Sequence, residues 1–138
     1  MTIGHKNKTV ATLLAFLFGS LGVHRFYLHG PKDIGAWLHL ITLPITGILL
    51  RIDAAQPLIT ILNPFVISVL ASFIETFIIG LTPDDKWDLQ YNQNSGRQSD
   101  SGWPIALLMV LTLGVGATAL IAAIARTFDL ILTGGAYG

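Results

Sequence analysis

Long apolar segments alternate with short polar stretches along this chain, and the charged residues collect in the polar stretches. Four apolar segments run from about Thr9 to Leu28, from about Ile34 to Leu50, within Leu58 to Leu81, and from about Trp103 to Ala125. A helix of about 20 residues reaches about 30 Å, the thickness of the hydrocarbon layer of a bilayer. Unpaired backbone groups cannot face lipid, so we predict that each segment is a transmembrane helix.

The apolar segments do not alternate between apolar and polar positions. Runs such as ITLPITGILL are apolar at consecutive positions, whereas the strands of a membrane β-barrel alternate with a period of two. The predicted fold class is therefore an all-α integral membrane protein with about four transmembrane helices.

Turn residues suggest how these helices are connected. Gly30-Pro31 favours a helix end followed by a helix start, which predicts a tight antiparallel hairpin for the first two helices, within residues 1–57. Residues 58–138 would add two further transmembrane helices, joined by a polar loop at 82–102. The third helix can begin at Pro64, or it can begin near Leu58 and kink at the proline; we prefer the later start.

Composition supports a membrane protein and excludes several other classes. Of 138 residues, 52% are hydrophobic and 12% are charged, against about 25% charged residues in an average soluble domain. The formal net charge is zero, so we expect no nucleic-acid partner. The chain has no cysteine, which excludes disulfides, thiolate catalysis and thiolate metal sites.

The basic residues do not orient a bundle of four spans. Such a bundle places four of them on each face: Lys6, Lys8, Arg51 and Arg126 on one, and Arg25, Lys32, Lys86 and Arg97 on the other. The two faces then carry equal numbers of basic residues, and the positive-inside rule gives no preferred orientation. Because the long loop is net acidic, we prefer an arrangement with both termini inside.

Residues 6–53 resemble the TM-two domain family, a hairpin of two transmembrane helices. The resemblance depends on KNKTVATLLAFLFGSLGVHRFYLHG followed by IGAWLHLITLPITGILLRID. The residues that match the family motif are Gly19, Gly22, His24, Arg25, Phe26, Tyr27 and Asp53. The chain departs from the family where His29 intervenes before Gly30, and in the reduced glycine content of its second helix. The resemblance implies a membrane hairpin and, with GLTPDDKWDLQYN, a bacterial inner-membrane protein; it implies no particular activity.

Glu75 is an acidic residue well inside an apolar segment, in SFIETFIIGL. A carboxylate at that depth costs on the order of 2–3 kcal/mol on insertion scales, so it should be paired, neutral or in contact with water. With four alternating helices, the ends of the first and third helices share a face. We therefore predict a structural ion pair between Arg25 and Glu75, with His24 as another possible neighbour of the carboxylate.

Two histidines raise the possibility of a metal or haem site. His24 and His39 lie on consecutive predicted helices and can approach the same face. No His-x-x-His or Glu-x-x-His spacing accompanies them, and a transition-metal site normally needs more converging ligands. We therefore expect no metal ligand, no cofactor and no catalytic residue in this chain.

Small residues recur at the spacing that lets membrane helices pack closely. Ala11, Ala15 and Gly19 lie four apart in the first segment, and Thr112 and Gly116 lie four apart in the fourth. These faces can hold the bundle together or bind another membrane protein. The sequence does not distinguish between the two.

The sequence favours a polytopic membrane protein without catalytic activity, acting as an interaction, accessory or structural component. Its expected partners are the lipid bilayer and other membrane proteins or further copies of itself. One alternative is a small oligomeric transporter or channel that uses Glu75. Pro44 and Pro64 favour this alternative, because transporters often contain broken helices. The other is an intramembrane haem or metal protein.

Overall fold

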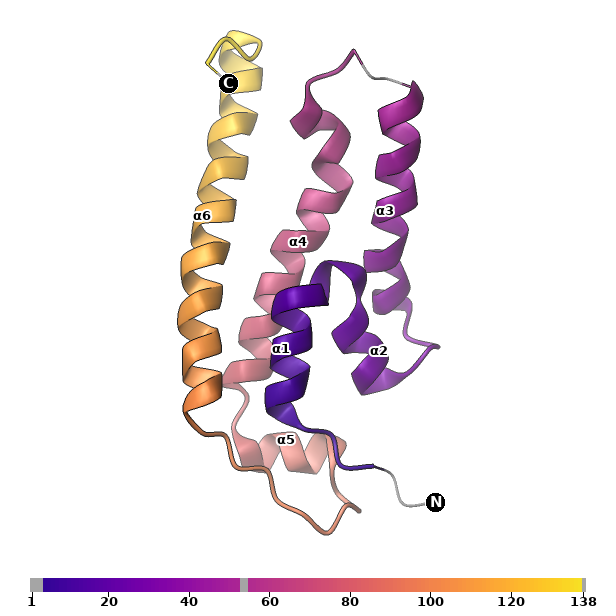
Figure 1. Ribbon diagram of the computed structural model, residues 1–138, viewed down its shortest axis with the longest axis vertical. Helices are drawn as coiled ribbons and strands as arrows, with labels where there is room; N and C mark the ends of the chain where they lie inside the picture. The colour runs from indigo at the N-terminus through magenta and orange to yellow at the C-terminus, as the bar shows by residue number, and fades with distance from the viewer. Residues whose placement is uncertain (1–3, 53–54, 138) are drawn as a thin grey trace.

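The structure is a computed structural model that describes residues 4–52 and 55–137, and within these ranges the protein is all-α. Three long helices, α3 (Ile34–Ile52), α4 (Leu58–Leu81) and α6 (Trp103–Thr133), run along the long axis of the molecule (Figure 1). The shorter elements are α1 (Lys8–Phe18), the 3₁₀ turn η1 (Gly19–Leu21), α2 (Val23–His29) and α5 (Asp84–Tyr91).

Three helices of the described chain, α3, α4 and α6, are long and apolar enough to cross a membrane. The prediction of four spans is therefore wrong, and the error lies in the first apolar segment. That segment forms α1, which has only 11 residues and so reaches about 16 Å. The chain then turns at η1 and runs back as α2, so α1 and α2 form a hairpin beside one part of α3 and α4 (Figure 1).

Gly22 explains why the first segment folds back. Its φ angle is +72°, in the left-handed region that residues with a Cβ rarely adopt. A Cβ added at Gly22 would lie 2.4 Å from the carbonyl oxygen of Ala36, so the turn packs directly on the backbone of α3. A continuous apolar pattern therefore conceals a turn that depends on a single glycine.

Gly19 provides the second close approach of the hairpin. A Cβ added there would lie 2.5 Å from the Cβ of Ser72, so η1 packs tightly against α4. The tight hairpin thus lies between α1 and α2, whereas the sequence predicted its turn at Gly30-Pro31. Residues 30–33 instead connect α2 to α3.

The third predicted helix, α4, begins at Leu58 and continues through Pro64 to Leu81. The preferred start at Pro64 is therefore wrong, and the earlier start is correct. Pro64 is the seventh residue of α4, beyond the first four residues whose N–H groups lack an intrahelical partner. It therefore removes one backbone hydrogen bond, and the helix continues past it.

The polar connection at 82–102 contains the short helix α5, which the sequence did not predict. Pro83 precedes it, and Asp84 and Asp85 lie in its first turn, where acidic side chains interact favourably with the helix dipole. Trp87 is buried and its Nε1 donates to the carbonyl oxygen of Lys6 at 2.9 Å. Trp87 therefore anchors α5 to the segment that precedes α1.

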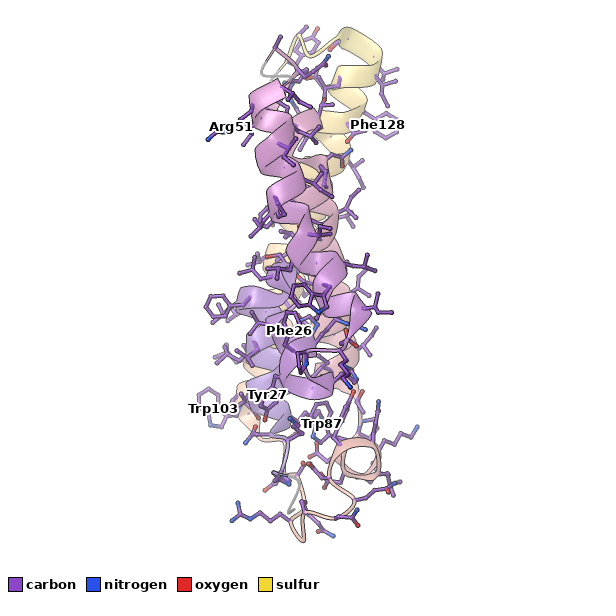
Figure 2. The ribbon with its side chains drawn as sticks, turned by 90° about the vertical axis from the view of Figure 1, so that its right-hand side faces the viewer. Phe26, Tyr27, Arg51, Trp87, Trp103 and Phe128 are labelled. Atoms are coloured by element: carbon purple, nitrogen blue, oxygen red, sulfur yellow. The ribbon has the colours of Figure 1, made fainter. Side chains whose placement is uncertain are left out.

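The two ends of the molecule differ. The amino terminus and α5 lie at one end, called here the α5 end, and the carboxyl terminus lies at the other (Figure 1). Tyr27, Trp87 and Trp103 lie toward the α5 end, whereas Arg51 and Phe128 lie toward the opposite end (Figure 2). The described residues nearest the two termini therefore lie at opposite ends of the three long helices, whereas the sequence analysis placed both termini on one face.

Candidate functional site

A cluster of polar side chains surrounds Glu75 between α2, α3 and α4. The Oε1 atom of Glu75 accepts a hydrogen bond from Nη1 of Arg25 at 2.5 Å. Its Oε2 atom lies 2.7 Å from Nε2 of His24 and 3.1 Å from Nε2 of His39. The carboxylate is thus surrounded by nitrogen atoms from two other helices.

The turn at Gly22 brings these groups together. It places His24 and Arg25 in the first turn of α2, directed back toward α4. The side chain of His24 is 1% exposed and that of Glu75 is 22% exposed. Arg25 and Glu75, which the sequence analysis expected to pair, are therefore in contact, and the two histidines share the same carboxylate.

Asp33 completes the ionic part of the cluster. Its Oδ1 atom accepts from Nε of Arg25 at 2.8 Å and from the backbone N–H of Ala36 at 2.7 Å. The hydrogen bond from Arg25 holds the pKa of Asp33 below its ordinary value, against the opposing effect of burial. Sequence reasoning missed Asp33, although an aspartate just before a helix is a typical N-terminal cap.

Gly35 leaves the space that the Arg25 side chain occupies. A Cβ added at Gly35 would lie 2.3 Å from Nε of Arg25. A larger residue on this turn of α3 would therefore displace the guanidinium from Glu75 and Asp33. Gly35 therefore contributes to the site because its missing side chain leaves room for the guanidinium of Arg25.

A chain of hydrogen bonds connects the cluster to the tip of the α1–α2 hairpin. Nδ1 of His39 lies 2.7 Å from Oγ of Ser68, and this hydroxyl donates to the carbonyl oxygen of Ser20 at 2.8 Å. Ser20 belongs to η1, the turn between α1 and α2. The polar residues of α3 and α4 therefore also fasten the hairpin in place.

A small cavity lies between the cluster and α5. It measures about 150 Å³, and its lining includes His24, Arg25, His29, Glu75 and Tyr91. Pockets for small molecules usually measure about 300–1,000 Å³, so this cavity suits water better than an organic substrate. In the described ranges, no group of three His, Asp or Glu side chains could hold a metal ion.

A larger hollow of about 680 Å³ lies outside the long helices, between α5 and the polar segment that follows it. Its lining includes Asp85, Asp88 and Arg97. Hydrogen bonds from Asn92 and Ser99 hold the pKa of Asp88 below its ordinary value. The carboxylate of Asp88 therefore stabilises the segment after α5 through these hydrogen bonds, although the residue also lines the hollow.

The remaining motif residues support the hairpin from outside the cluster. The rings of Phe26 and Trp37 meet edge to face at 5.4 Å. The hydroxyl of Tyr27 accepts from the backbone N–H of Asn7 at 2.9 Å. Asp53 lies outside the described residues.

The small residues at helix-packing spacing face the interior of the bundle. Ala11 and Ala15 are fully buried and belong to a core cluster with Ile79 of α4. Thr112 of α6 is also fully buried. A Cβ added at Gly116 would be in van der Waals contact with Phe73 of α4. The structure therefore uses these residues to pack α1 and α6 against α4.

An apolar groove separates α4 from α6 away from the α5 end. The tip of the hairpin is hydrogen-bonded to Ser68 of α4, about 13 residues or about 20 Å from the end of that helix at Leu81. The groove is lined mainly by Ile59, Thr60, Asn63, Val66, Ile67, Leu70, Leu120, Ala123, Ile124, Thr127, Phe128 and Ile131.

Comparisons with known proteins agree with the membrane assignment. The family model for the TM2 domain matches residues 4–55, which confirms the predicted resemblance there. The "Uncharacterized membrane protein YozV" of Bacillus subtilis (strain 168) is 65% identical over 26 residues, or 19% of this chain. That match spans 33% of the relative's length. No solved structure matches the chain. The matched region includes the hairpin and α3, whereas α4, α5 and α6 lie outside it.

Proposed function

We propose that this TM2-domain membrane protein is a non-catalytic structural component of the bacterial inner membrane that associates with a second copy of itself. The observation that carries the proposal is the groove between α4 and α6. The α1–α2 hairpin fills only the part of the bundle nearest the α5 end, so the groove offers space for another helix.

Asn63 favours a second copy as the occupant of the groove. It is exposed, lines the groove and lies inside the predicted span α4. An amide both donates and accepts hydrogen bonds, so two Asn63 side chains can satisfy each other across a two-fold axis. Such polar pairs stabilise contacts between membrane helices, where lipid supplies no hydrophobic driving force.

The Glu75 cluster supports the absence of catalytic activity in this proposal. Arg25, His24 and His39 hydrogen-bond to the carboxylate, so these groups are engaged with one another rather than free to act on a substrate. The adjacent cavity of about 150 Å³ is small for a substrate.

The α1–α2 hairpin starts from the α5 end and turns back toward it, and we call it the re-entrant hairpin. It favours one alternative, a small oligomeric transporter or channel that uses Glu75. Broken helices commonly form the ion and substrate sites of transporters. This alternative predicts a flux across the membrane that depends on Glu75, whereas the structural proposal predicts self-association that does not require transport.

Disulfide crosslinking between single introduced cysteines tests self-association. Native thiols cannot interfere, because the chain contains no cysteine. Ile67 and Ile74 are matched positions on α4, exposed by 61% and 62%, and Ile67 lines the groove whereas Ile74 does not. We expect Ile67→Cys to form a disulfide-linked dimer in membranes and Ile74→Cys to remain monomeric. A disulfide requires Cα atoms within about 7 Å of each other.

Asn63→Leu in the Ile67→Cys background tests the amide pair. Loss of an interhelical hydrogen bond of about 1 kcal/mol lowers the association constant about fivefold, and the crosslinked fraction should fall accordingly. Equal crosslinking at both positions would contradict the proposed interface. A different chain that co-purifies in fixed proportion would instead indicate an accessory subunit of a larger complex.

A further inference from the structure

We propose that His39 and Glu75 together bind a proton, and that this proton fastens the tip of the α1–α2 hairpin to α4. The proposal concerns the polar cluster and does not depend on self-association through the α4–α6 groove. It follows from the hydrogen atoms that the observed contacts require.

Ser68 determines the state of His39. A hydroxyl has one hydrogen to donate, and that of Ser68 donates to the carbonyl oxygen of Ser20 at 2.8 Å. The contact of 2.7 Å between Oγ of Ser68 and Nδ1 of His39 therefore needs a hydrogen on the imidazole nitrogen. In this arrangement Nδ1 of His39 is protonated.

The other nitrogen of His39 then requires a second proton. A neutral imidazole with its hydrogen on Nδ1 presents a lone pair at Nε2, and Nε2 lies 3.1 Å from Oε2 of Glu75. An ionised carboxylate offers only lone pairs, so one additional proton must lie between the two atoms. The structure thus has the geometry of a protonated His39–Glu75 pair.

His24 does not hold the additional proton. Its Nε2 faces Glu75, whereas its Nδ1 is buried without a hydrogen-bond partner among the described residues. A second hydrogen on Nδ1 would leave a buried charged donor unpaired, which is costly. His24 therefore stays neutral and donates from Nε2 to the carboxylate.

The charges around the pair favour a bound proton. From α2 and the connection that follows it, Arg25 contributes one positive charge and Asp33 one negative charge, and Glu75 of α4 contributes another negative charge. The cluster is therefore net negative without the proton and neutral with it, which favours protonation in a poorly solvated site.

Other titratable groups lie farther from the pair. His29 of α2 is 3.5 Å from Asp33, and its Nε2 is 3.5 Å from the hydroxyl of Tyr91 on α5. Lys8 of α1 pairs with Asp84. On α6, Arg126 and Asp129 pair with each other.

Loss of the proton changes the partner of Ser68. When the proton leaves through the cavity that Glu75 lines, His39 can keep its remaining hydrogen on Nε2 and donate it to the carboxylate. The Ser68 hydroxyl can then rotate and donate to Nδ1 of His39, which leaves the Ser20 carbonyl without this hydrogen bond. Protonation therefore holds the hairpin tip, and deprotonation releases it.

Nuclear magnetic resonance of histidine-labelled protein in nanodiscs tests the proton site directly, with His39→Gln used to assign the signal. We expect His39 to carry hydrogens on both nitrogens at low pH and to lose one of them as the pH is raised, while His24 keeps a single hydrogen, on Nε2. A His39 signal that stays neutral at every pH, or a second hydrogen on His24 instead, would overturn the proposal.

Electron paramagnetic resonance of a spin label tests the link to the hairpin tip. Phe18→Cys provides an exposed attachment site next to η1. As the pH rises through the titration, the ratio of mobile to immobile label should increase about fivefold, the effect of one hydrogen bond of about 1 kcal/mol. Ser68→Ala should give the mobile state at every pH.

Ser72→Ala is the matched control, because Ser72 is buried one turn along α4 and its hydroxyl donates to Val69 of its own helix. It should preserve the pH response of the label. A label that is insensitive to pH in the otherwise unchanged chain, or identical behaviour of the two serine variants, would show that Ser68 does not transmit the proton to the tip.

Discussion

At the scale of residues, a carboxylate inside an apolar helix needs compensation, and Glu75 receives it from three side chains. The depth of Glu75 was visible in the sequence and led to the expected pairing with Arg25. The contributions of His39 and Ser68 were not, because their contact depends on how α3 and α4 are rotated about their axes. Hydropathy reports the depth of a residue and not its neighbours.

Replacing Glu75 should destabilise the fold. Glu75→Gln removes the negative charge that faces Arg25, and breaking a buried ion pair costs about 3–5 kcal/mol. Because Glu75 is partly exposed and Arg25 keeps Asp33, we expect a loss of about 2–3 kcal/mol in the free energy of unfolding. Reversible unfolding in detergent would measure it.

Asp85→Asn is the matched control, since Asp85 is an exposed acid in α5. Its free energy of unfolding should change by no more than about 0.5 kcal/mol. If Glu75→Gln were as stable as this control, the ionic cluster would not contribute to the stability of the fold.

At the scale of elements, the sequence indicated the apolar segments correctly but not their continuity. The first segment is as apolar as a span, yet it forms two short helices around the turn at Gly22. Pro64 gave the opposite error, because it suggested a break where α4 is continuous. Both errors arise because a glycine or proline permits a turn, while packing against neighbouring helices decides whether the turn forms.

Gly22→Ala should destabilise the hairpin. The new Cβ would meet the carbonyl of Ala36, and alanine disfavours the φ of +72° at this position. Backbone strain of this kind costs about 1–3 kcal/mol, and the contact with Ala36 adds to it. Thermal unfolding followed by circular dichroism should show a lower midpoint.

Gly47→Ala in α3 is the control, because a Cβ there would meet nothing within 4 Å. It should stabilise the helix slightly, by about 0.5–1 kcal/mol. Equal unfolding midpoints for the two alanine variants would argue against a structural requirement for glycine at position 22.

At the scale of the whole molecule, the re-entrant hairpin changes the distribution of charge between the two faces. In a bundle of four spans the eight Lys and Arg residues divide equally. With three spans, six of the eight belong to the α5 side of the molecule and only Arg51 and Arg126 to the other. The positive-inside rule then predicts that the amino terminus and α5 are cytoplasmic and that the carboxyl terminus is outside.

The location of the two termini tests the three-span arrangement most directly. Gly4→Cys and Tyr137→Cys place single thiols at exposed positions near either end of this cysteine-free chain. A membrane-impermeant thiol reagent should label Tyr137→Cys in intact cells and Gly4→Cys only in inverted membrane vesicles. Labelling of both positions from the same side would contradict the re-entrant hairpin and restore an even number of spans.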